Sequence, residues 1–277
     1  MTREGTIWRW VGSAGLALMV LVALVPTYWM ALASLRADQV LALWPPAVSP
    51  LSHPLSFDAF GVVLGQERTL AWLMNSGLIA SSSVLVTLLI ATPAAYALSR
   101  GDGRLLGGAS ALLFASKLLP ATVLITPLYV MVRGFGLLNS PVAVLLGNLS
   151  FAVPLATFVL KGYLDAIPRA IDEAAQIDGA SRLRVLLSII LPNAGPALAA
   201  VAIYVFIVSW NDFIFARTFL TGGNSTTITV GAAMFMGEFD TRWNQVMAIG
   251  CLATMPCLAF FLALQRHLTR GLQMAGV

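Results

Sequence analysis

The sequence predicts an all-α, polytopic membrane protein with six transmembrane helices. Of its 277 residues, 58% are hydrophobic and only 10% are charged, and the mean hydropathy is +0.86. Soluble domains carry about 25% charged residues. Several apolar runs are long enough to cross a hydrocarbon core of roughly 30 Å, which takes about 20 helical residues. Because backbone groups in lipid must be satisfied internally, and these runs are too continuous for the alternating strands of porins, helices are predicted.

The predicted spans are read directly from the uninterrupted apolar runs. They are Val11–Ala33, Ala71–Leu98, Ala109–Val132, Pro141–Leu160, Ala197–Leu220 and Asn244–Leu264. The first run resembles a signal peptide because Arg3 and Arg9 precede it. It is longer than the apolar region of about 7 to 15 residues that such peptides contain, so we expect it to be retained.

The distribution of Lys and Arg predicts the orientation in the membrane. With the N-terminus inside, the cytoplasmic segments hold Arg3, Arg9, Arg100, Arg104, Lys161, Arg169, Arg182, Arg184, Arg266 and Arg270. The outer segments hold only Arg36, Arg68, Arg133 and Arg242. Cytoplasmic loops carry an excess of basic residues, so both termini are predicted in the cytoplasm. The isoelectric point of about 9.4 mostly restates this bias and does not indicate a nucleic-acid partner.

Three connections are long enough to carry function within what we predict to be a single transmembrane domain, residues 1–277. The outer segment 34–70 contains WPPAVSPLSHPLSF, whose prolines disfavour regular helix, and is expected to form an extracytoplasmic cap. A second outer segment, 221–243, opens with TGGNSTT and continues with VGAAMFMGEF, which is apolar but too short to span. We expect it to dip back toward the cavity. The third connection is the cytoplasmic segment 161–195.

A short amphipathic helix is predicted in the cytoplasmic segment. Pro168 suits its first helical position, and Gly179 is placed to end it in the left-handed conformation. At helical spacing, one face holds Arg169, Asp172, Glu173 and Gln176, and the other holds Ile167, Ala170, Ile171 and Ala174. Ala174 and Ala175 keep one side thin, so another surface can approach closely. The residues alone are equally compatible with a docking element and with a helix that lies on the membrane or caps its own bundle.

A spaced motif runs through this segment. The pattern is E-A-A, three residues, G, nine residues, I, one residue, L-P, and it is met by Glu173, Ala174, Ala175, Gly179, Ile189, Leu191 and Pro192. It resembles the cytoplasmic signature of permease subunits in binding-protein-dependent ABC importers. The stretches PLYVMVRGFGLLNS, FVLKGYLDAIPRAIDEAAQIDGAS, SWNDFIFA and QRHLTRGLQMAG resemble the carbohydrate branch, specifically the smaller permease of maltose-type systems.

This resemblance implies a coupling helix that is seated in a cleft of a cytoplasmic ATPase. The residues that it assigns to coupling are Glu173, Ala174, Ala175, Gln176, Ile177, Asp178 and Gly179. It also implies a bacterial inner-membrane protein that moves a sugar by alternating access. The implied partners are a second homologous permease, two ATPase subunits, an extracytoplasmic sugar-binding protein and membrane lipid.

The chain itself lacks the residues for ATP hydrolysis by a Walker A loop. That loop needs a Lys followed by Ser or Thr after a glycine-rich stretch. The lysines here are Lys117, followed by Leu, and Lys161, followed by Gly. We therefore expect no catalytic residues and no cofactor in this chain, with ATP and Mg²⁺ bound by the partner ATPases.

Polar residues inside predicted spans are candidates for the solute pathway, because charges near the bilayer centre usually face the protein interior. Asn211 and Asp212 lie in the outer half of the fifth span, and Lys117 lies near the middle of the third. An Asp212–Lys117 ion pair is one hypothesis, and separate partners for each residue are the alternative. Tyr129, Trp210 and Asn211, with Asp212, are candidates to line a sugar path, although the aromatic residues also fit a packed core.

Two other function classes remain to be weighed. A stand-alone secondary transporter or channel would explain the spans, but it would not need the Glu173 helix. The run Asp178–Arg182, DGASR, faintly resembles the start of a phosphatidyltransferase signature, but no further aspartate for divalent metal occurs before Asp212. Cys251 and Cys257 share the last span and are expected to be buried packing thiols rather than a disulfide or metal site.

Overall fold

The computed structural model describes residues 3–116, 119–221, 225–237 and 241–274, and the regular structure in these residues is helical. The predicted all-α membrane fold is confirmed. The chain divides into two compact units: unit 1 comprises residues 1–69 and 232–254, and unit 2 comprises residues 70–231 and 255–277. Each unit is described by itself.

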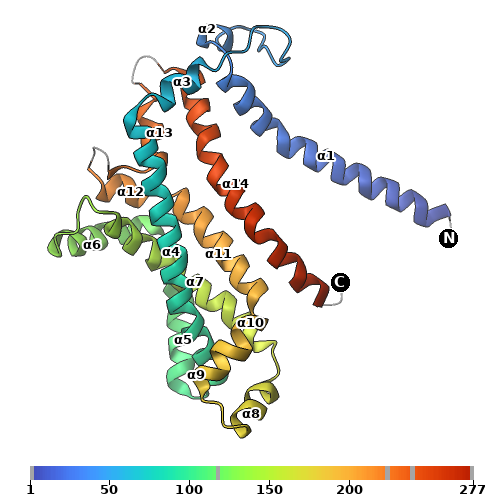
Figure 1. The fold of residues 1–277 in the computed structure, drawn as a ribbon, viewed down its shortest axis with the longest axis vertical. Helices are drawn as coiled ribbons and strands as arrows, with labels where there is room; N and C mark the ends of the chain where they lie inside the picture. Colours follow the sequence, from blue (N-terminus) through green and yellow to red (C-terminus); the bar gives the residue numbers. More distant parts are fainter. Residues whose placement is uncertain (1–2, 117–118, 222–224, 238–240, 275–277) are drawn as a thin grey trace. The chain divides into compact units, whose positions relative to one another are not determined.

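The helices are labelled along the chain in Figure 1. They are α1 (Arg3–Ser34), α2 (Asp38–Leu41), α3 (Asp58–Leu64), α4 (Glu67–Arg100), α5 (Arg104–Ser116), α6 (Ala121–Gly134), α7 (Pro141–Asp165), α8 (Arg169–Ile177), α9 (Arg182–Val185), the π-helix η1 (Leu186–Ile190), α10 (Leu191–Asn193), α11 (Gly195–Trp210), α12 (Ile214–Phe219), α13 (Ile228–Met234) and α14 (Trp243–Met274).

Four helices in the described residues are long and apolar enough to cross a membrane unaided: α1, α4, α7 and α14. They correspond to the first, second, fourth and sixth predicted spans. Two bent helix pairs, α5 with α6 and α9–α10 with α11, bring the number of spans to six if each pair counts as one. The third predicted span is therefore divided between α5 and α6 rather than formed by one helix.

The fifth predicted span is wrong at its outer end. We expected one helix over Ala197–Leu220, but α11 ends at Trp210 and α12 begins at Ile214. The carboxylate of Asp212 accepts the backbone N–H groups of Phe215 at 3.2 Å and Ala216 at 3.0 Å. This side chain caps the start of α12, and local capping of this kind competes with continuation of the preceding helix.

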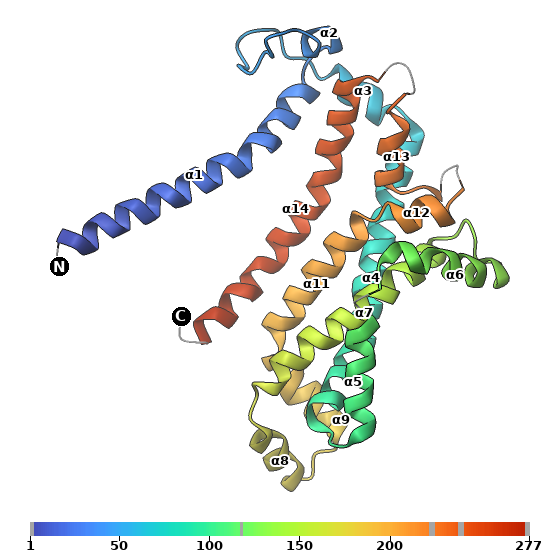
Figure 2. The same ribbon diagram turned by 180° about the vertical axis from the view of Figure 1, so that it is seen from behind.

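Unit 2 is built around close contacts between α4, α7 and α11, which both ribbon views show (Figures 1 and 2). The buried contact residues are mainly small, and they include Ala91 and Ala95 of α4, Ala152 and Ala156 of α7, and Ala197 of α11. Small residues let helix backbones approach closely, which is how helices associate in lipid. The same core extends to Ala175 of α8 and to Val185 beside η1, so the segment 161–195 is packed onto the bundle.

The second outer segment also contacts the bundle. The backbone N–H of Ile228, at the start of α13, donates to the hydroxyl of Ser76 at 2.9 Å. The side-chain amide of Asn75 donates to the carbonyl of Thr226 at 3.1 Å. Gly231 lies so close to Trp72 that an added Cβ would be 2.1 Å from the indole ring, so α13 is fitted directly against α4.

Gly231→Ala is therefore expected to destabilise unit 2. The new methyl group must push α13 or the Trp72 ring aside, which costs about 1–3 kcal/mol in a packed site. The midpoint of thermal unfolding in detergent should fall by about 5 °C. Gly162→Ala in α7 is the matched control, because nothing lies within 4 Å of its added Cβ. An unchanged midpoint for Gly231→Ala would contradict the packing.

Unit 1 holds the first outer segment. Its proline-rich part, between α2 and α3, is irregular as the sequence predicts. The carboxylate of Asp38 accepts the backbone N–H of Asn244 at 2.9 Å, so the segment is fastened to the start of α14. Cys251 of this unit and Cys257 of unit 2 are free thiols, but both are half-buried rather than buried as expected.

Candidate functional site

The predicted cytoplasmic helix is present as α8, and its sequence explains where it begins and ends. We expected Pro168 at the first helical position. It is instead the N-cap residue, one position before the helix begins, because its backbone is extended with ψ near 130°. Gly179 has φ +82°, as predicted. The N–H of Ala180 bonds to the carbonyl of Ala175, and the N–H of Gly179 to that of Gln176, both at 3.0 Å. These two bonds form a Schellman motif, which closes the helix.

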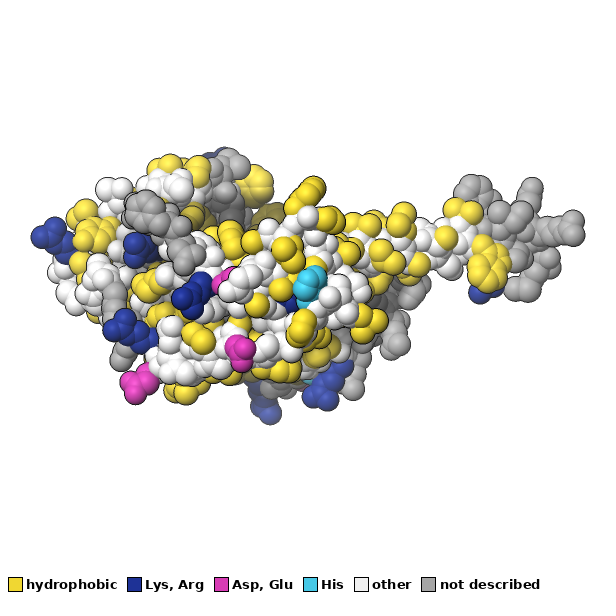
Figure 3. All heavy atoms as spheres, turned by 90° about the horizontal axis from the view of Figure 1, so that it is seen from above, with side chains coloured by type: hydrophobic (Ala, Val, Ile, Leu, Met, Phe, Trp, Pro, Cys, Tyr) yellow, Lys and Arg dark blue, Asp and Glu magenta, His cyan; other side chains and the backbone are white. Residues whose placement is uncertain are grey.

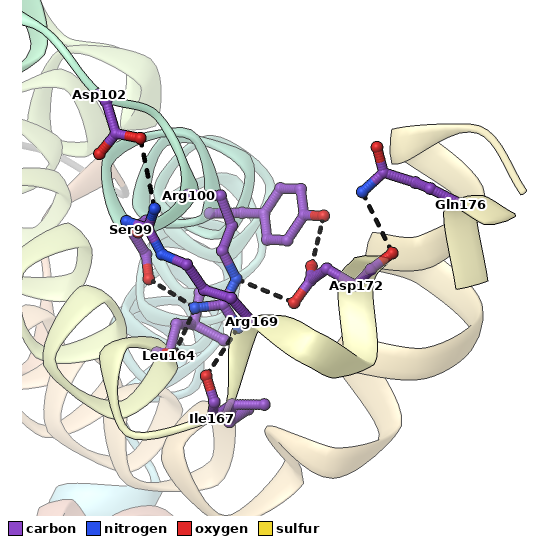
Figure 4. Close-up of polar contacts among 9 residues, drawn as sticks. Ser99, Arg100, Asp102, Leu164, Ile167, Arg169, Asp172 and Gln176 are labelled. Atoms are coloured by element: carbon purple, nitrogen blue, oxygen red, sulfur yellow. Dashed lines mark hydrogen bonds and ion pairs between the residues drawn. The ribbon is translucent and has the colours of Figure 1, made fainter. Parts of the chain in front are cut away.

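Asp172 ties α8 to the bundle. Its side chain is only 6% exposed, and one carboxylate oxygen accepts Nε–H of Arg100 at 3.0 Å. The other oxygen accepts the hydroxyl of Tyr96 at 2.7 Å. Figure 4 shows Arg100 reaching Asp172 from the end of α4. Charge-assisted hydrogen bonds to a buried carboxylate are among the stronger polar contacts in proteins, so this residue fixes the position of α8.

Arg100 joins three elements at one point. Besides its ion pair with Asp172, its Nη1 donates to the carbonyl of Leu164 at 3.0 Å and its Nη2 to that of Ile167 at 3.1 Å. These carbonyls lie at and just beyond the end of α7, where the last turn of a helix leaves acceptors unpaired. The guanidinium therefore links α4, α7 and α8 (Figure 4).

Arg169, in the first turn of α8, adds a second link to α4. It donates to the carbonyl of Ser99 at 3.0 Å and pairs with Asp102 at 3.3 Å. The Asp102 pair is exposed on both sides, and such pairs contribute little to stability. The bond to the Ser99 carbonyl is the more effective positioning contact because it is partly buried.

The structure decides which side of α8 faces the bundle, a point that the sequence left open. Asp172, from the predicted polar face, and Ala175 are the buried residues of this helix. The ion pair with Arg100 makes burial of Asp172 favourable. Of the predicted apolar face, Ala170, Ile171 and Ala174 are exposed, whereas Ile167 packs against the core. Ile177 is also exposed, at 86%. The exposed apolar side chains of α8 are thus left without a partner among the described residues.

A cavity of about 560 Å³ lies within unit 2 beside this helix. Its wall comes from α4, α5, α8 and α9, and its lining includes Arg100, Asp172, Glu173, Gln176 and Arg182. Basic and acidic side chains are interspersed, so the cavity has no single sign of charge. Figures 1 and 2 show α8 at the same end of unit 2 as α9, which places every coupling residue assigned by the motif at this end.

The rest of the motif anchors this region. Ile189 lies within η1, and Leu191 and Pro192 begin α10. Ile190, between them, is 1% exposed and belongs to the same core as Ala175. The hydroxyl of Tyr163 donates to the carbonyl of Asn193 at 3.0 Å. The segment after Gly179 is therefore a packed connection from α8 to α11.

The candidate pathway residues are spread over different environments in unit 2. Trp210 is 3% exposed and stacks on Phe206 with ring centroids 5.8 Å apart. Tyr129 of α6 is half-buried against Phe219 at 6.5 Å. Asn211 is exposed, and its amide donates to the carbonyl of Ile207 at 2.8 Å. Lining of a solute path by these residues stays a prediction.

Asp212 has structural partners of its own. Besides capping α12, its backbone carbonyl accepts the hydroxyl of Thr229 at 2.6 Å. Lys117, its hypothetical ion-pair partner, lies outside the described residues. The pair therefore stays a hypothesis, whereas the capping role of Asp212 is observed.

Tyr96 and Arg100 are site residues that sequence reasoning missed. Arg100 entered only as a cytoplasmic positive charge, and Tyr96 was not selected. They precede Asp172 by 72 to 76 positions, so no local spacing connects them. An arginine in the last turn of a span, with an acidic residue in a later cytoplasmic helix, was the available signal.

The fold and this site define a polytopic membrane protein. Residues 88–274 match the family described as binding-protein-dependent transport system inner membrane component. This match covers more than half of the chain, so the protein belongs to that family.

Individual relatives agree with this assignment. The chain is 34% identical to the trehalose/maltose transport system permease protein MalG of Thermococcus litoralis, covering 98% of this chain and 97% of that protein. It is 33% identical to the melibiose/raffinose/stachyose import permease protein MelC of Bacillus subtilis, over 74% of each chain. The resemblance to permeases of carbohydrate ABC importers is thereby confirmed.

Solved structures show the same fold. A chain of a bacterial ABC transporter involved in the import of the acidic polysaccharide alginate superposes with a TM-score of 0.81 at 21% identity, covering 96% of this chain and 98% of that one. A chain of a bacterial alginate ABC transporter in complex with an alginate pentasaccharide-bound periplasmic protein gives a TM-score of 0.69 at 16% identity, over 94% of each chain.

Proposed function

We propose that this protein is the transmembrane permease subunit of an ATP-driven importer for a sugar or a chemically related solute. Family membership supports the transport role, and the solutes in the names of MalG and MelC are oligosaccharides. The subunit forms part of the translocation pathway with a second, homologous permease. The pathway opens alternately to the two sides of a bacterial inner membrane, with both termini in the cytoplasm.

The observation that carries this proposal is the sidedness of α8. Its inner side is held to α4 and α7 through Asp172 and Arg100, while its outer side exposes Ile171, Ala174 and Ile177. Exposed apolar surface of this kind marks an interaction site. A cleft in a cytoplasmic ATPase subunit is the partner that the motif implies. A pull on α8 then reaches the transmembrane helices through contacts that are already formed.

The energy comes from outside the chain. Neither of its lysines is followed by Ser or Thr, as a Walker A loop requires. Two ATPase subunits bind ATP and Mg²⁺ and drive α8, and an extracytoplasmic binding protein delivers the solute to the outer segments 34–70 and 221–243. Glu173–Gly179 transmits the motion, and Tyr129, Trp210, Asn211 and Asp212 remain the proposed pathway residues.

Reconstitution tests this proposal against a stand-alone transporter or channel. Proteoliposomes are prepared with the permease alone and with its permease partner and ATPases, and uptake of labelled maltose, trehalose and melibiose is measured. Uptake is expected only with the ATPases, ATP on their side and the binding protein on the other. Uptake by the permease alone would contradict the proposal, because an unpowered carrier has no need of α8.

A further inference from the structure

Arg36 of unit 1 is a buried cation with an incomplete set of partners. It lies between α1 and α2 and is 2% exposed. Its Nη2 donates to the carbonyl oxygen of Ser49 and to the hydroxyl of Ser52, the latter at 3.1 Å. Its Nε and Nη1 are buried and have no hydrogen-bond partner among the described residues. Arginine stays charged in proteins, and a buried charge without a counter-ion is costly.

This side chain lines a polar cavity of about 540 Å³ that belongs wholly to unit 1. The other walls come from α2, the start of α3 and the start of α14. Its charged lining residues, besides Arg36, are Asp38, Asp58 and Arg242. Arg36 therefore borders a space that a ligand can enter.

The two acidic residues of the cavity do not neutralise Arg36. One oxygen of Asp38 accepts the backbone N–H of Asn244, and Asp58 is exposed in the first turn of α3. Among the described residues Arg36 makes no ion pair. Arg242 also lines the cavity, so its two basic and two acidic residues sum to no net charge. The unpaired N–H groups of Arg36 can bind one carboxylate, whereas a multivalent anion such as phosphate would bring further negative charge beside Asp38 and Asp58.

The surroundings of the cavity indicate that this carboxylate belongs to a protein. Leu51 and Phe57, next in sequence to the Ser52 and Ser56 of this site, are 93% and 74% exposed. Figure 3 shows hydrophobic side chains among the charged ones on a face of the molecule. Aromatic residues and arginine in a partly apolar surface are typical of protein interfaces and of their most important contacts.

We propose that the extracytoplasmic solute-binding protein inserts an aspartate or glutamate side chain into this cavity, where it pairs with Arg36. This inference rests on the proposed function, which places the outer segment 34–70 on the binding protein's side of the membrane. The inference adds to that function a specific site at which the binding protein contacts the permease. The binding protein supplies a counter-ion to Arg36, which has none among the described residues, and the exposed side chains of Leu51 and Phe57 become covered.

The test uses the importer assembled in nanodiscs and the binding protein that supports uptake in the proteoliposome assay. Loss of one member of a buried charge pair acts mainly on dissociation. Arg36→Gln is therefore expected to raise the dissociation rate of the binding protein about thirty-fold, with the association rate changed by less than about three-fold. Arg36→Lys should restore most of the lifetime of the complex, because it keeps the charge.

Arg68→Gln is the matched control, since this exposed arginine lies in the same unit and its loss changes the net charge equally. It should leave the dissociation rate within about two-fold of the unmodified importer. Unchanged kinetics for Arg36→Gln, with uptake intact, would overturn the carboxylate site and leave the proposed function standing. If Arg36→Gln instead prevents copurification of the second permease, the counter-ion comes from that subunit and the inference is wrong. If no binding protein supports uptake, the proposed function itself fails.

Discussion

Asp172→Ala is expected to reduce solute uptake at least ten-fold while ATP hydrolysis by the assembled importer continues. The change leaves Arg100 buried without its carboxylate, and breaking a buried pair costs about 3–5 kcal/mol. Arg100 keeps its bonds to the carbonyls of Leu164 and Ile167. The contact between α4 and α7 therefore survives, whereas α8 loses its main attachment. Uptake and phosphate release are measured in the same proteoliposomes.

Asp165→Ala is the matched control for this variant. Asp165 also pairs with a basic residue, Lys161, but its side chain is 43% exposed, and exposed pairs contribute about 0–1 kcal/mol. Uptake by Asp165→Ala should stay near that of the unmodified importer. Equal uptake by the two variants would mean that the Asp172 contact does not transmit force.

Ala174→Trp is expected to prevent binding of the ATPase subunits without unfolding the permease. Ala174 is exposed on the outer side of α8, so an indole there meets solvent in the free subunit but blocks close approach of another surface. Copurification of the ATPase should fall at least ten-fold, because a few kcal/mol of steric conflict is enough. The midpoint of thermal unfolding of the permease should change by less than about 2 °C.

The neighbouring residue provides the comparison. Ala175 has the same side chain but is 9% exposed and packs in the core of unit 2. Ala175→Trp should therefore lower the thermal midpoint itself, since overpacking a core costs about 1–3 kcal/mol. If Ala174→Trp binds the ATPase normally, the exposed side of α8 is not the docking face.

The sequence was most informative where a single physical constraint decides the structure. The length and continuity of apolar runs predict α1, α4, α7 and α14 because a helix is the stable way to cross lipid. The end of α8 could also be predicted from the sequence, since the left-handed backbone at Gly179 disfavours other residues. Both features depend on local chemistry alone.

The sequence failed where a contact between distant residues overrides the local pattern. Helical spacing placed Asp172 on the polar face of α8 but did not show which face is buried, and the contacts with Arg100 and Tyr96 of α4 decide this. Asp212 was considered as an intramembrane charge, whereas in the structure it caps α12 and ends the fifth predicted span early. Arg36 was counted only as an outer positive charge, because burial cannot be read from a proline-rich segment.

The most direct test of the central claim is a cross-link from the exposed side of α8 to the ATPase. Cys251 and Cys257 are first replaced by alanine, and Ile177→Cys or Ala175→Cys is then introduced and labelled with a maleimide–benzophenone in the assembled importer. Ile177 is 86% exposed and Ala175 is buried, so illumination should join only the Ile177→Cys variant to the ATPase subunit. The proposal that α8 couples the permease to the ATPase is contradicted if Ile177→Cys gives no such product. It is also contradicted if a membrane-impermeant maleimide labels Ile177→Cys from the outer side of intact cells.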